Sequence, residues 1–335
     1  MNNYKYVNTR MGTQNSYRFS NGNVLPITAI PYGMASFTIQ TERREAGWFY
    51  SPYSKSFEGI RLTHQPSPWL GDYGELIIYG QNGKIETEDA KRWSYYNNEK
   101  CVLEPAYMKA YINRDRYTFE LSPTNSGAVI DFAFLQESGN RISILGYKKT
   151  EFEVCDGMII GETEAFVSTA SKEAIKEYFV LSVDVPFEQE RAENAISLKI
   201  KGKTASVRLA TSFISKEQAM LNYKRELENK SLKDIYALAR EEWEKYLSRI
   251  EIEDPDEEKK KTFYSCLYRV FLWPRKFYEI NEKGMAVHRN THTGEIVSGV
   301  YYVDNGFWDT YRTVYPLLSL LDTDAYAEMA EGFYN

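Results

Sequence analysis

The segment SVRLATSFISKEQAMLNYKREL, residues 206–227, decides the fold, because its hydrophobic pattern changes half-way along. Apolar and polar side chains alternate in its first part, residues 206–214, as in a half-buried β-strand. The alternation ends at Ser215, which forms a capping-box pattern with Gln218, so we expect a helix to begin there. The segment therefore predicts a boundary between a β-rich part and a helical part of the chain.

The chain before this boundary contains short runs rich in Val, Ile, Phe and Tyr, separated by clusters of Gly, Asn, Pro and Ser. These runs are ELIIYG at 75–80, AVIDFAF at 128–134, ISILGY at 142–147 and EYFVLSVDV at 177–185. No helical pattern interrupts them, which favours an antiparallel sandwich over βαβ units. We therefore predict a mainly β N-terminal domain, a β-sandwich, over residues 1–214.

The chain after the boundary has the three-to-four-residue apolar spacing of helices. We expect linker helices over residues 215–253, including LKDIYALAREEWEKYLSRI at 232–250. Asp254 is expected to cap the next helix, and a later helix near Phe307 contains Pro316, which should bend or end it. Helices this amphipathic need partners, so they either pack on the β-domain or open a longer helical domain over 254–335.

Composition excludes several classes of function. The 335 residues carry a net charge of −6 and contain no basic block, which argues against nucleic-acid binding. No apolar run approaches the roughly 18 residues of a membrane span, and no signal peptide is evident, so we expect a cytoplasmic protein. The three cysteines are far apart and are expected to be buried free thiols. We interpret His288 and His292 as part of a solvated loop, not as metal ligands.

Two loops combine polar, glycine and aromatic residues where packing alone does not need them. GTQNSYRFSNGNVLPITAIPYGM, residues 12–34, contains Asn21 and Gly22, which tolerate left-handed backbone and offer amide hydrogen bonds. GIRLTHQPSPWLGDYGEL, residues 59–76, contains His64, Trp69 and Asp72 in a rigid loop that suits a ligand pocket. The structural alternatives are an ordinary surface loop and a turn whose histidine is satisfied by the backbone.

A third stretch, VDNGFWDTYRTVYPLL at 303–318, places Asp304, Trp308, Asp309 and Arg312 at the entry of a helix. Asp309 and Arg312 are three residues apart and should share a face. A carboxylate beside an indole can bind sugar hydroxyls while the ring packs on the sugar. The alternative is an N-terminal acid that favours the helix dipole together with a surface ion pair.

Taken in order, these stretches resemble glycoside hydrolase family 92. The segment VNTRMGTQNSYRFSNGNVLPITAIPYGM is similar to the family's N-terminal signature, FEGIRLTHQPSPWLGDYGEL to its second signature, and GFWDTYRTVYPLLSLL to the WDTYR helix. TSFISKEQAMLNY also matches the family's junction between sandwich and helices. The loop THQPSPW departs from the commoner Ser/Gly-rich version, which leaves the linkage preference open.

The resemblance implies a β-sandwich followed by linker helices and an (α/α)6 toroid, of which 254–335 would be the beginning. It implies an exo-acting α-mannosidase, of α-1,2 type, that releases mannose from N-glycans or mannan with inversion. Calcium would contact the sugar, and a Glu and an Asp would act as general acid and general base. The chain would be a fragment, inactive alone, because the catalytic carboxylates and the calcium ligands are expected beyond residue 335.

The resemblance carries over only sugar-binding residues to this chain: Trp308, Asp309, Trp69, His64, Asp72, Asn21 and Gly22. The implied partner is an α-mannoside oligosaccharide, and exposed helices would favour self-association. A non-enzymatic carbohydrate-binding module remains an alternative that would also explain the aromatic residues. A disaccharide phosphorylase of similar architecture is a third interpretation.

Overall fold

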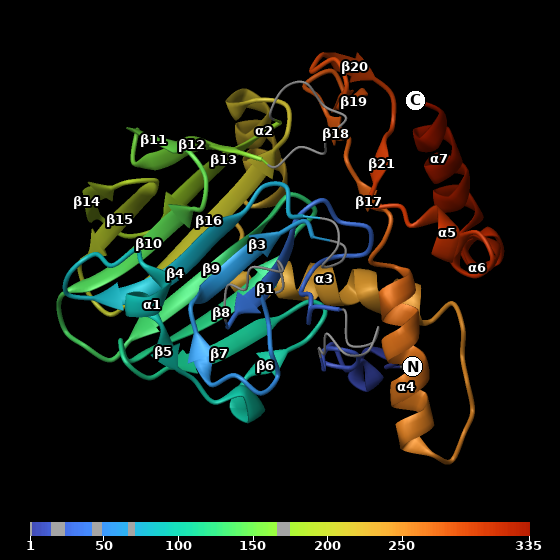
Figure 1. Cartoon of the computed structure of the whole chain (residues 1–335), viewed down its shortest axis with the longest axis horizontal. Coiled ribbons are helices and arrows are strands. Elements are labelled where there is room, and N and C mark those ends of the chain that lie inside the picture. The colour runs from blue at the N-terminus through green and yellow to red at the C-terminus, as the bar shows by residue number, and fades with distance from the viewer. Residues whose placement is uncertain (1, 15–23, 42–48, 66–70, 166–174) are drawn as a thin grey trace.

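The computed structural model describes residues 2–14, 24–41, 49–65, 71–165 and 175–335. Antiparallel strands fill one half of the molecule, and the C-terminal helices lie at the other end (Figure 1). The predicted fold class, a β-sandwich followed by helices, is confirmed.

Two antiparallel sheets make up the sandwich in the described part of the chain. In spatial order, six strands form the first: β1 (Ser36–Gln40), β3 (Gly59–Thr63), β4 (Leu76–Asn82), β10 (Asn140–Gly146), β15 (Ala195–Ile200) and β14 (Phe187–Ala192). Eight strands form the second: β11 (Thr150–Cys155), β12 (Met158–Glu164), β13 (Lys176–Val183), β16 (Thr204–Ser212), β9 (Gly127–Phe134), β8 (Tyr117–Pro123), β7 (Met108–Ile112) and β6 (Val102–Leu103).

Every run predicted as a strand is a strand. In β16, for example, Val207 and Leu209 are buried, while Ser206 and Arg208 beside them are only partly so, as alternation predicts. The inward residues of both sheets form one continuous apolar core. Three small sheets flank the sandwich: β2 (Ser56–Phe57) with β5 (Ser94–Tyr95), β17 (Arg275–Lys276) with β21 (Tyr302–Val303), and β18 (Glu279–Ile280) with β19 (Ala286–Arg289) and β20 (Ile296–Ser298).

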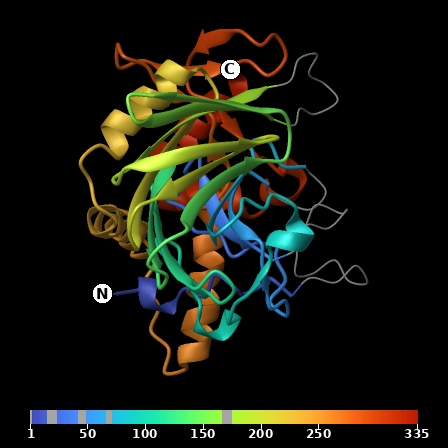
Figure 2. The ribbon, with the colours of Figure 1, turned by 90° about the vertical axis from the view of Figure 1, so that its left-hand side faces the viewer.

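Two helices cover the outer face of the eight-stranded sheet: α2 (Lys216–Glu226) and α3 (Leu232–Leu247). Figure 2 shows them on the same side of the sandwich. Ser215 caps α2, since its side chain accepts a hydrogen bond from the Gln218 N–H. The Gln218 side chain instead reaches Asn222, so only half of the predicted capping box forms. Trp243 of α3 is fully buried, and its indole N–H donates to the Ala29 carbonyl at 2.7 Å.

Helix α4 (Glu257–Val270) begins two residues later than predicted, because Asp256, not Asp254, caps it. Tyr268 and Arg269 of α4 donate to backbone carbonyls of the N-terminal segment, which ties this helix to the β-domain. The remaining helices are the short α1 (Asp89–Arg92) and, at the C-terminal end, α5 (Phe307–Thr310), α6 (Val314–Leu321) and α7 (Thr323–Tyr334), with 3-10 turns η1 (Tyr4–Tyr6) and η2 (Asn98–Lys100).

Three smaller expectations differ from the structure. The predicted helix at Phe307 breaks before Val314, not at Pro316; this proline sits in the first turn of α6, where a missing N–H costs nothing. His288 lies buried on β19, so the solvated-loop interpretation is wrong for it. All three cysteines are free thiols, but only Cys101 is buried.

Candidate active-site region

His64 lies directly after β3, in the interior between the two sheets. Its Nδ1 is 2.9 Å from the Gly74 carbonyl oxygen, and its ring stacks on Tyr73 at 5.0 Å between centroids. Burial lowers the pKa of the imidazole to about 4, so the ring is neutral near pH 7. The backbone contact is the one expected of a structural histidine, and a role in sugar binding stays a prediction.

Asp72 is buried and accepts hydrogen bonds from four donors. Arg61 Nη2 donates at 3.0 Å and Arg61 Nε at 3.2 Å, while the Thr63 hydroxyl and the His64 N–H donate at 2.7 and 2.8 Å. Arg61 is fully buried and also pairs with Glu75. We call Arg61, Asp72 and Glu75 the buried ion cluster. It fixes both ends of the 64–74 loop on the sandwich.

Glu177 joins this region from β13 of the opposite sheet, and sequence reasoning missed it. Its Oε1 is 3.8 Å from His64 Nε2, and neither carboxylate oxygen has a hydrogen-bond partner among the described residues. Burial raises the pKa of the Glu177 carboxyl well above its ordinary value, and the charge of Asp72 raises it further. The signal was in the sequence: strand alternation places Glu177 on the core face with Phe179.

Tyr73 and Asp304 bring the second and third predicted stretches together. The Tyr73 hydroxyl donates to Asp304 Oδ2 at 2.7 Å, across 231 residues of sequence. Arg275 Nε lies 3.7 Å from the same oxygen, and Arg275 Nη1 donates to the Thr63 carbonyl. Asp304 has a left-handed backbone with φ of 63°, an uncommon state for a non-glycine residue that these contacts hold in place. The loop of His64 is therefore joined to the segment that leads into α5.

Trp308 and Asp309 are on α5, four and five residues after Asp304, and both are exposed. The Trp308 side chain is 78% exposed, with the Arg312 guanidinium 5.5 Å from its ring. In the described part of the chain, no residue gives the Asp309 carboxylate a hydrogen bond or an ion pair, so the surface ion pair of the structural alternative does not form with Arg312. Both side chains are free to meet a ligand.

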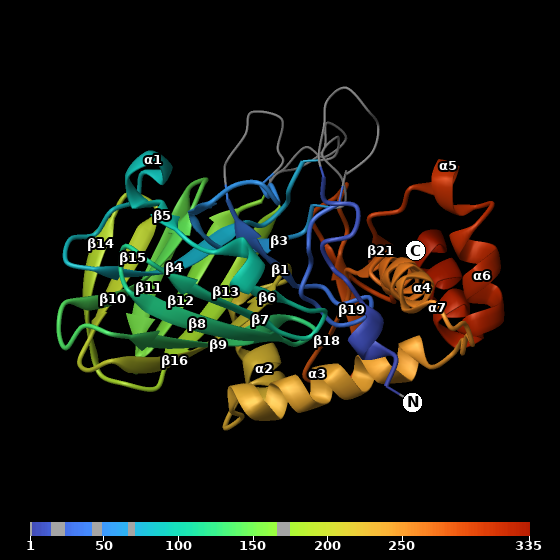
Figure 3. The same cartoon turned by 90° about the horizontal axis from the view of Figure 1, so that it is seen from below.

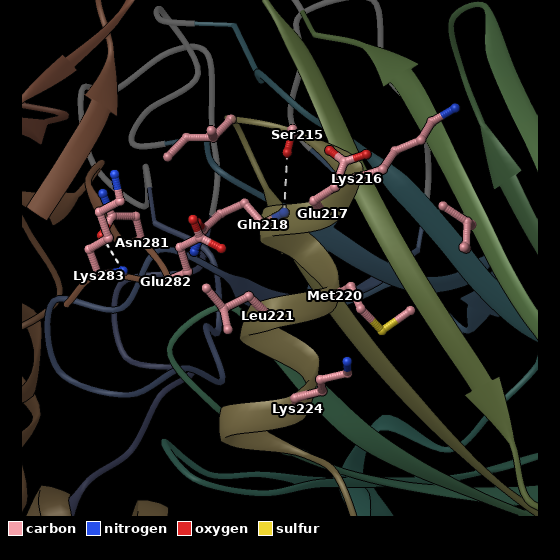
Figure 4. Close-up of a pocket in the computed structure, with 12 residues that line it drawn as sticks. Ser215, Lys216, Glu217, Gln218, Met220, Leu221, Lys224, Asn281, Glu282 and Lys283 are labelled. Carbon is pink, nitrogen blue, oxygen red and sulfur yellow. Dashed lines mark hydrogen bonds between the residues drawn. The ribbon is translucent and has the colours of Figure 1, made fainter. Parts of the chain in front are cut away.

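Asn21, Gly22 and Trp69 lie outside the described residues, so the structure tests neither their position nor a cleft that they would share with Trp308. Three pockets lie elsewhere on the molecule. Figure 4 shows one of about 670 Å³ between the N-terminal end of α2 and residues 281–283. None of these three is lined by His64, Asp72, Trp308 or Asp309.

The described residues do not fit a metal ion: no group of three or more His, Cys, Asp or Glu side chains among them could hold one. Asp72 and Glu75 are close together, but Arg61 already occupies them. Calcium needs six to eight oxygen ligands, and two carboxylates that are paired with an arginine do not supply them. Within the described ranges, no helix is long and apolar enough to cross a membrane.

The comparison with protein families gives two matches. The N-terminal domain of glycosyl hydrolase family 92 matches residues 6–230, and the catalytic domain of the same family matches residues 218–335. The chain belongs to glycosyl hydrolase family 92. The two matches overlap in α2 and the turn that follows it, where strands give way to helices.

Solved family 92 structures share the fold over the whole chain. The inverting mannosidase BT2199 from Bacteroides thetaiotaomicron VPI-5482 is 30% identical with a TM-score of 0.92, covering 99% of this chain and 48% of that one. The α-mannosidase BT3965 from Bacteroides thetaiotaomicron is 20% identical with a TM-score of 0.84, covering 99% and 49%. The search of curated proteins returned no match. This chain thus spans about half the length of the family 92 structures it matches.

Proposed function

We propose that the chain is the β-sandwich and first-helix part of an exo-acting α-mannosidase. The proposed reaction is release of mannose from α-1,2-linked ends of N-glycans or mannan, with inversion at the anomeric carbon. One observation carries the proposal: the 30% identity to an inverting mannosidase, which extends over 99% of this chain. The order of the three polar-aromatic stretches and the Tyr73–Asp304 contact between two of them support it.

Trp308 and Asp309 are the residues of this chain that we assign to the sugar. An exposed indole can pack on the C–H face of a pyranose, and an unpaired carboxylate can accept hydrogen bonds from two neighbouring hydroxyls. The buried His64 and Asp72 would act by holding the loop that contains Trp69. The proposal does not need either of them to touch the substrate.

The bond-breaking groups are assigned to the part of the family that this chain does not cover. Inversion needs a general acid and a general base about 6.5–9.5 Å apart, with room for water between them. Calcium would supply a hard cation for sugar hydroxyls, and the oxygen-rich site that it needs is likewise expected there. The residues of this chain bind and orient the sugar in this proposal.

The test compares residues 1–335 alone with the same residues fused to the part of BT2199 that they do not cover. We expect the fusion to release mannose from α-1,2-mannobiose, with β-mannose as the first anomer seen by NMR, and EDTA to stop it. A monodisperse, folded fusion that releases no mannose would contradict the proposal. EDTA-sensitive release by residues 1–335 alone would contradict our assignment of the catalytic groups.

A carbohydrate-binding module is the competing function, and calorimetry separates the two. Titration with α-1,2-mannobiose should give the same heat for residues 1–335 and for their Trp308→Ala variant if the sugar at Trp308 needs both halves of the site. Millimolar or tighter binding that disappears in Trp308→Ala would favour the module.

A further inference from the structure

The pocket beside the small β2–β5 sheet has a chemistry that the proposed function does not use. It has a volume of about 540 Å³, within the range of roughly 300–1,000 Å³ typical of small-molecule sites. Its lining includes the tyrosines Tyr53, Tyr95 and Tyr96 and the asparagines Asn97, Asn98 and Asn113. Figures 1 and 3 both separate β5 from α5 across the width of the molecule.

The walls of this pocket are built by one set of polar contacts. The Asn98 carboxamide donates to the Pro52 carbonyl at 2.8 Å and accepts from the Tyr50 hydroxyl at 3.2 Å. Asn97 caps the 3-10 turn η2, since its Oδ1 accepts from the two N–H groups of residues 99 and 100. The backbone of Tyr96 donates to the Lys55 carbonyl at 3.0 Å. These bonds join residues 50–55 to residues 95–100, so the pocket is held in shape before any ligand arrives.

A second set of polar groups in the pocket is free. Among the described residues, no side chain bonds the hydroxyls of Tyr53 and Tyr95 or the carboxamide of Asn113, whose backbone N–H alone is engaged. Tyr53 is 71% exposed and Tyr95 is 58% exposed, so most of each side chain is open to solvent. The Tyr95 ring is supported edge-on by Trp93, with 5.1 Å between centroids.

The charge and the free polar groups of the pocket indicate which chemical class of ligand it suits. Lys55 and Glu99 are the charged residues that line the pocket, and their charges cancel, which disfavours an anion or a cation. Flat exposed rings suit the C–H faces of a pyranose, while carboxamides and phenols both donate to and accept from hydroxyls. A purely apolar ligand would not use the hydrogen-bonding capacity of Asn113 and the two phenols. We propose that this pocket, at Tyr53, Tyr95 and Asn113, binds a neutral hexose oligosaccharide.

The test is affinity electrophoresis of residues 1–335 in native gels that contain mannan or dextran, both neutral hexose polymers. We expect at least one polymer to retard the chain. Tyr53→Ala or Tyr95→Ala should raise the dissociation constant for that polymer about threefold to tenfold. Asn113→Ala should also raise this dissociation constant. Because Tyr53 and Tyr95 are exposed, their variants should keep the wild-type melting temperature.

Two controls make the result specific. Tyr334→Ala removes another exposed tyrosine, 92% exposed and on α7, and should leave retardation unchanged. Leu320→Ala, 81% exposed on α6 and outside both proposed sugar sites, should also leave it unchanged. The inference is wrong if neither polymer retards the chain. It is also wrong if the Tyr53→Ala and Tyr95→Ala variants bind as wild type.

Discussion

The loop of His64 and Asp72 and the helix of Trp308 and Asp309 look alike in sequence but differ in the structure. Both combine a carboxylate with aromatic residues near glycine or proline. Asp72 accepts four hydrogen bonds in the interior, whereas Asp309 accepts none from the described residues and is exposed. The hydrogen-bonding capacity that a side chain leaves unused, more than its residue type, therefore separates a scaffold position from a candidate ligand position.

The largest effect that this comparison predicts is on stability, through the buried ion cluster. Asp72→Ala leaves the Arg61 guanidinium buried with one partner fewer, and breaking a buried pair typically costs about 3–5 kcal/mol. We expect a loss of that order in the free energy of unfolding, measured by urea denaturation. Asp309→Ala, the matched exposed carboxylate, should change it by less than about 0.5 kcal/mol. Equal losses in the two variants would show that Asp72 and Asp309 do not differ as scaffold and ligand positions.

Glu279 is a second buried carboxylate whose two oxygens both accept hydrogen bonds, and its effect on stability depends on pH. Its oxygens accept from Asn222, Ser212 and the Phe213 N–H. Burial nevertheless raises its pKa to about 7, against the opposing effect of these donors. Between about pH 4.5 and 7 the folded state therefore holds a proton that the unfolded state has released, so stability falls as pH rises.

Glu279→Gln should remove this slope. At about 1.4 kcal/mol per pKa unit, the wild type should lose on the order of 3 kcal/mol relative to the variant between pH 4.5 and 7. The bond from Asn222 that the variant loses shifts the whole curve without tilting it. His64 and Asp304 titrate in the same range in both proteins and cancel in the difference. Urea denaturation at half-unit pH steps gives the free energy of unfolding of both proteins. Parallel curves of this free energy against pH would show that Glu279 stays ionised in the folded state.

Tyr73→Phe should have an intermediate effect, because it tests the contact between the two regions. The variant removes only the hydroxyl that donates to Asp304, and a hydrogen bond to a charged group contributes about 1.5–3 kcal/mol. Arg275 remains near the carboxylate, so we expect the lower end of that range.

The position of the effect matters more than its size. Amide hydrogen exchange should accelerate over residues 304–310 in Tyr73→Phe while the strands of the sandwich keep wild-type protection. Tyr95→Phe, an exposed tyrosine on β5, should change exchange in neither region. Uniform acceleration across the whole chain in Tyr73→Phe would mean that Tyr73 acts as a general core residue and does not anchor α5.

Most of the fold could be predicted from the sequence because the strands obey a simple rule. Alternation fixes which side chains face the core, and the loss of alternation at Ser215 marks the first helix. The helix after Ser248 was harder, since Asp254 and Asp256 are both good caps and only the backbone geometry selects Asp256. The break after Thr310 was not predicted, because Pro316 is the helix-breaking residue type in this stretch and it lies six residues later, inside the first turn of α6.

The site was less predictable, because its contacts join residues far apart in sequence. Glu177 and His64 come from opposite sheets, and Tyr73 meets Asp304 across 231 residues. Nothing in the loop sequence tells whether Asp72 faces Arg61 or a ligand, since a carboxylate is needed in both cases. Sequence could point to the stretches that matter but could not assign each side chain to the interior or the surface.

Trp308→Ala should barely change stability, and it tests directly whether the exposed residues of α5 bind the sugar. The side chain is 78% exposed, and an exposed contact such as that with Arg312 contributes about 0.5–1 kcal/mol at most. The free energy of unfolding of residues 1–335 should therefore change by no more than that amount. The fusion with the remainder of BT2199 should lose at least tenfold in kcat/KM on α-1,2-mannobiose. Leu320→Ala, 81% exposed on α6, is the matched control and should keep both. Because solvent already surrounds the indole, a large loss of stability would place Trp308 with Asp72 as scaffold, and the sugar would have to be held by other residues.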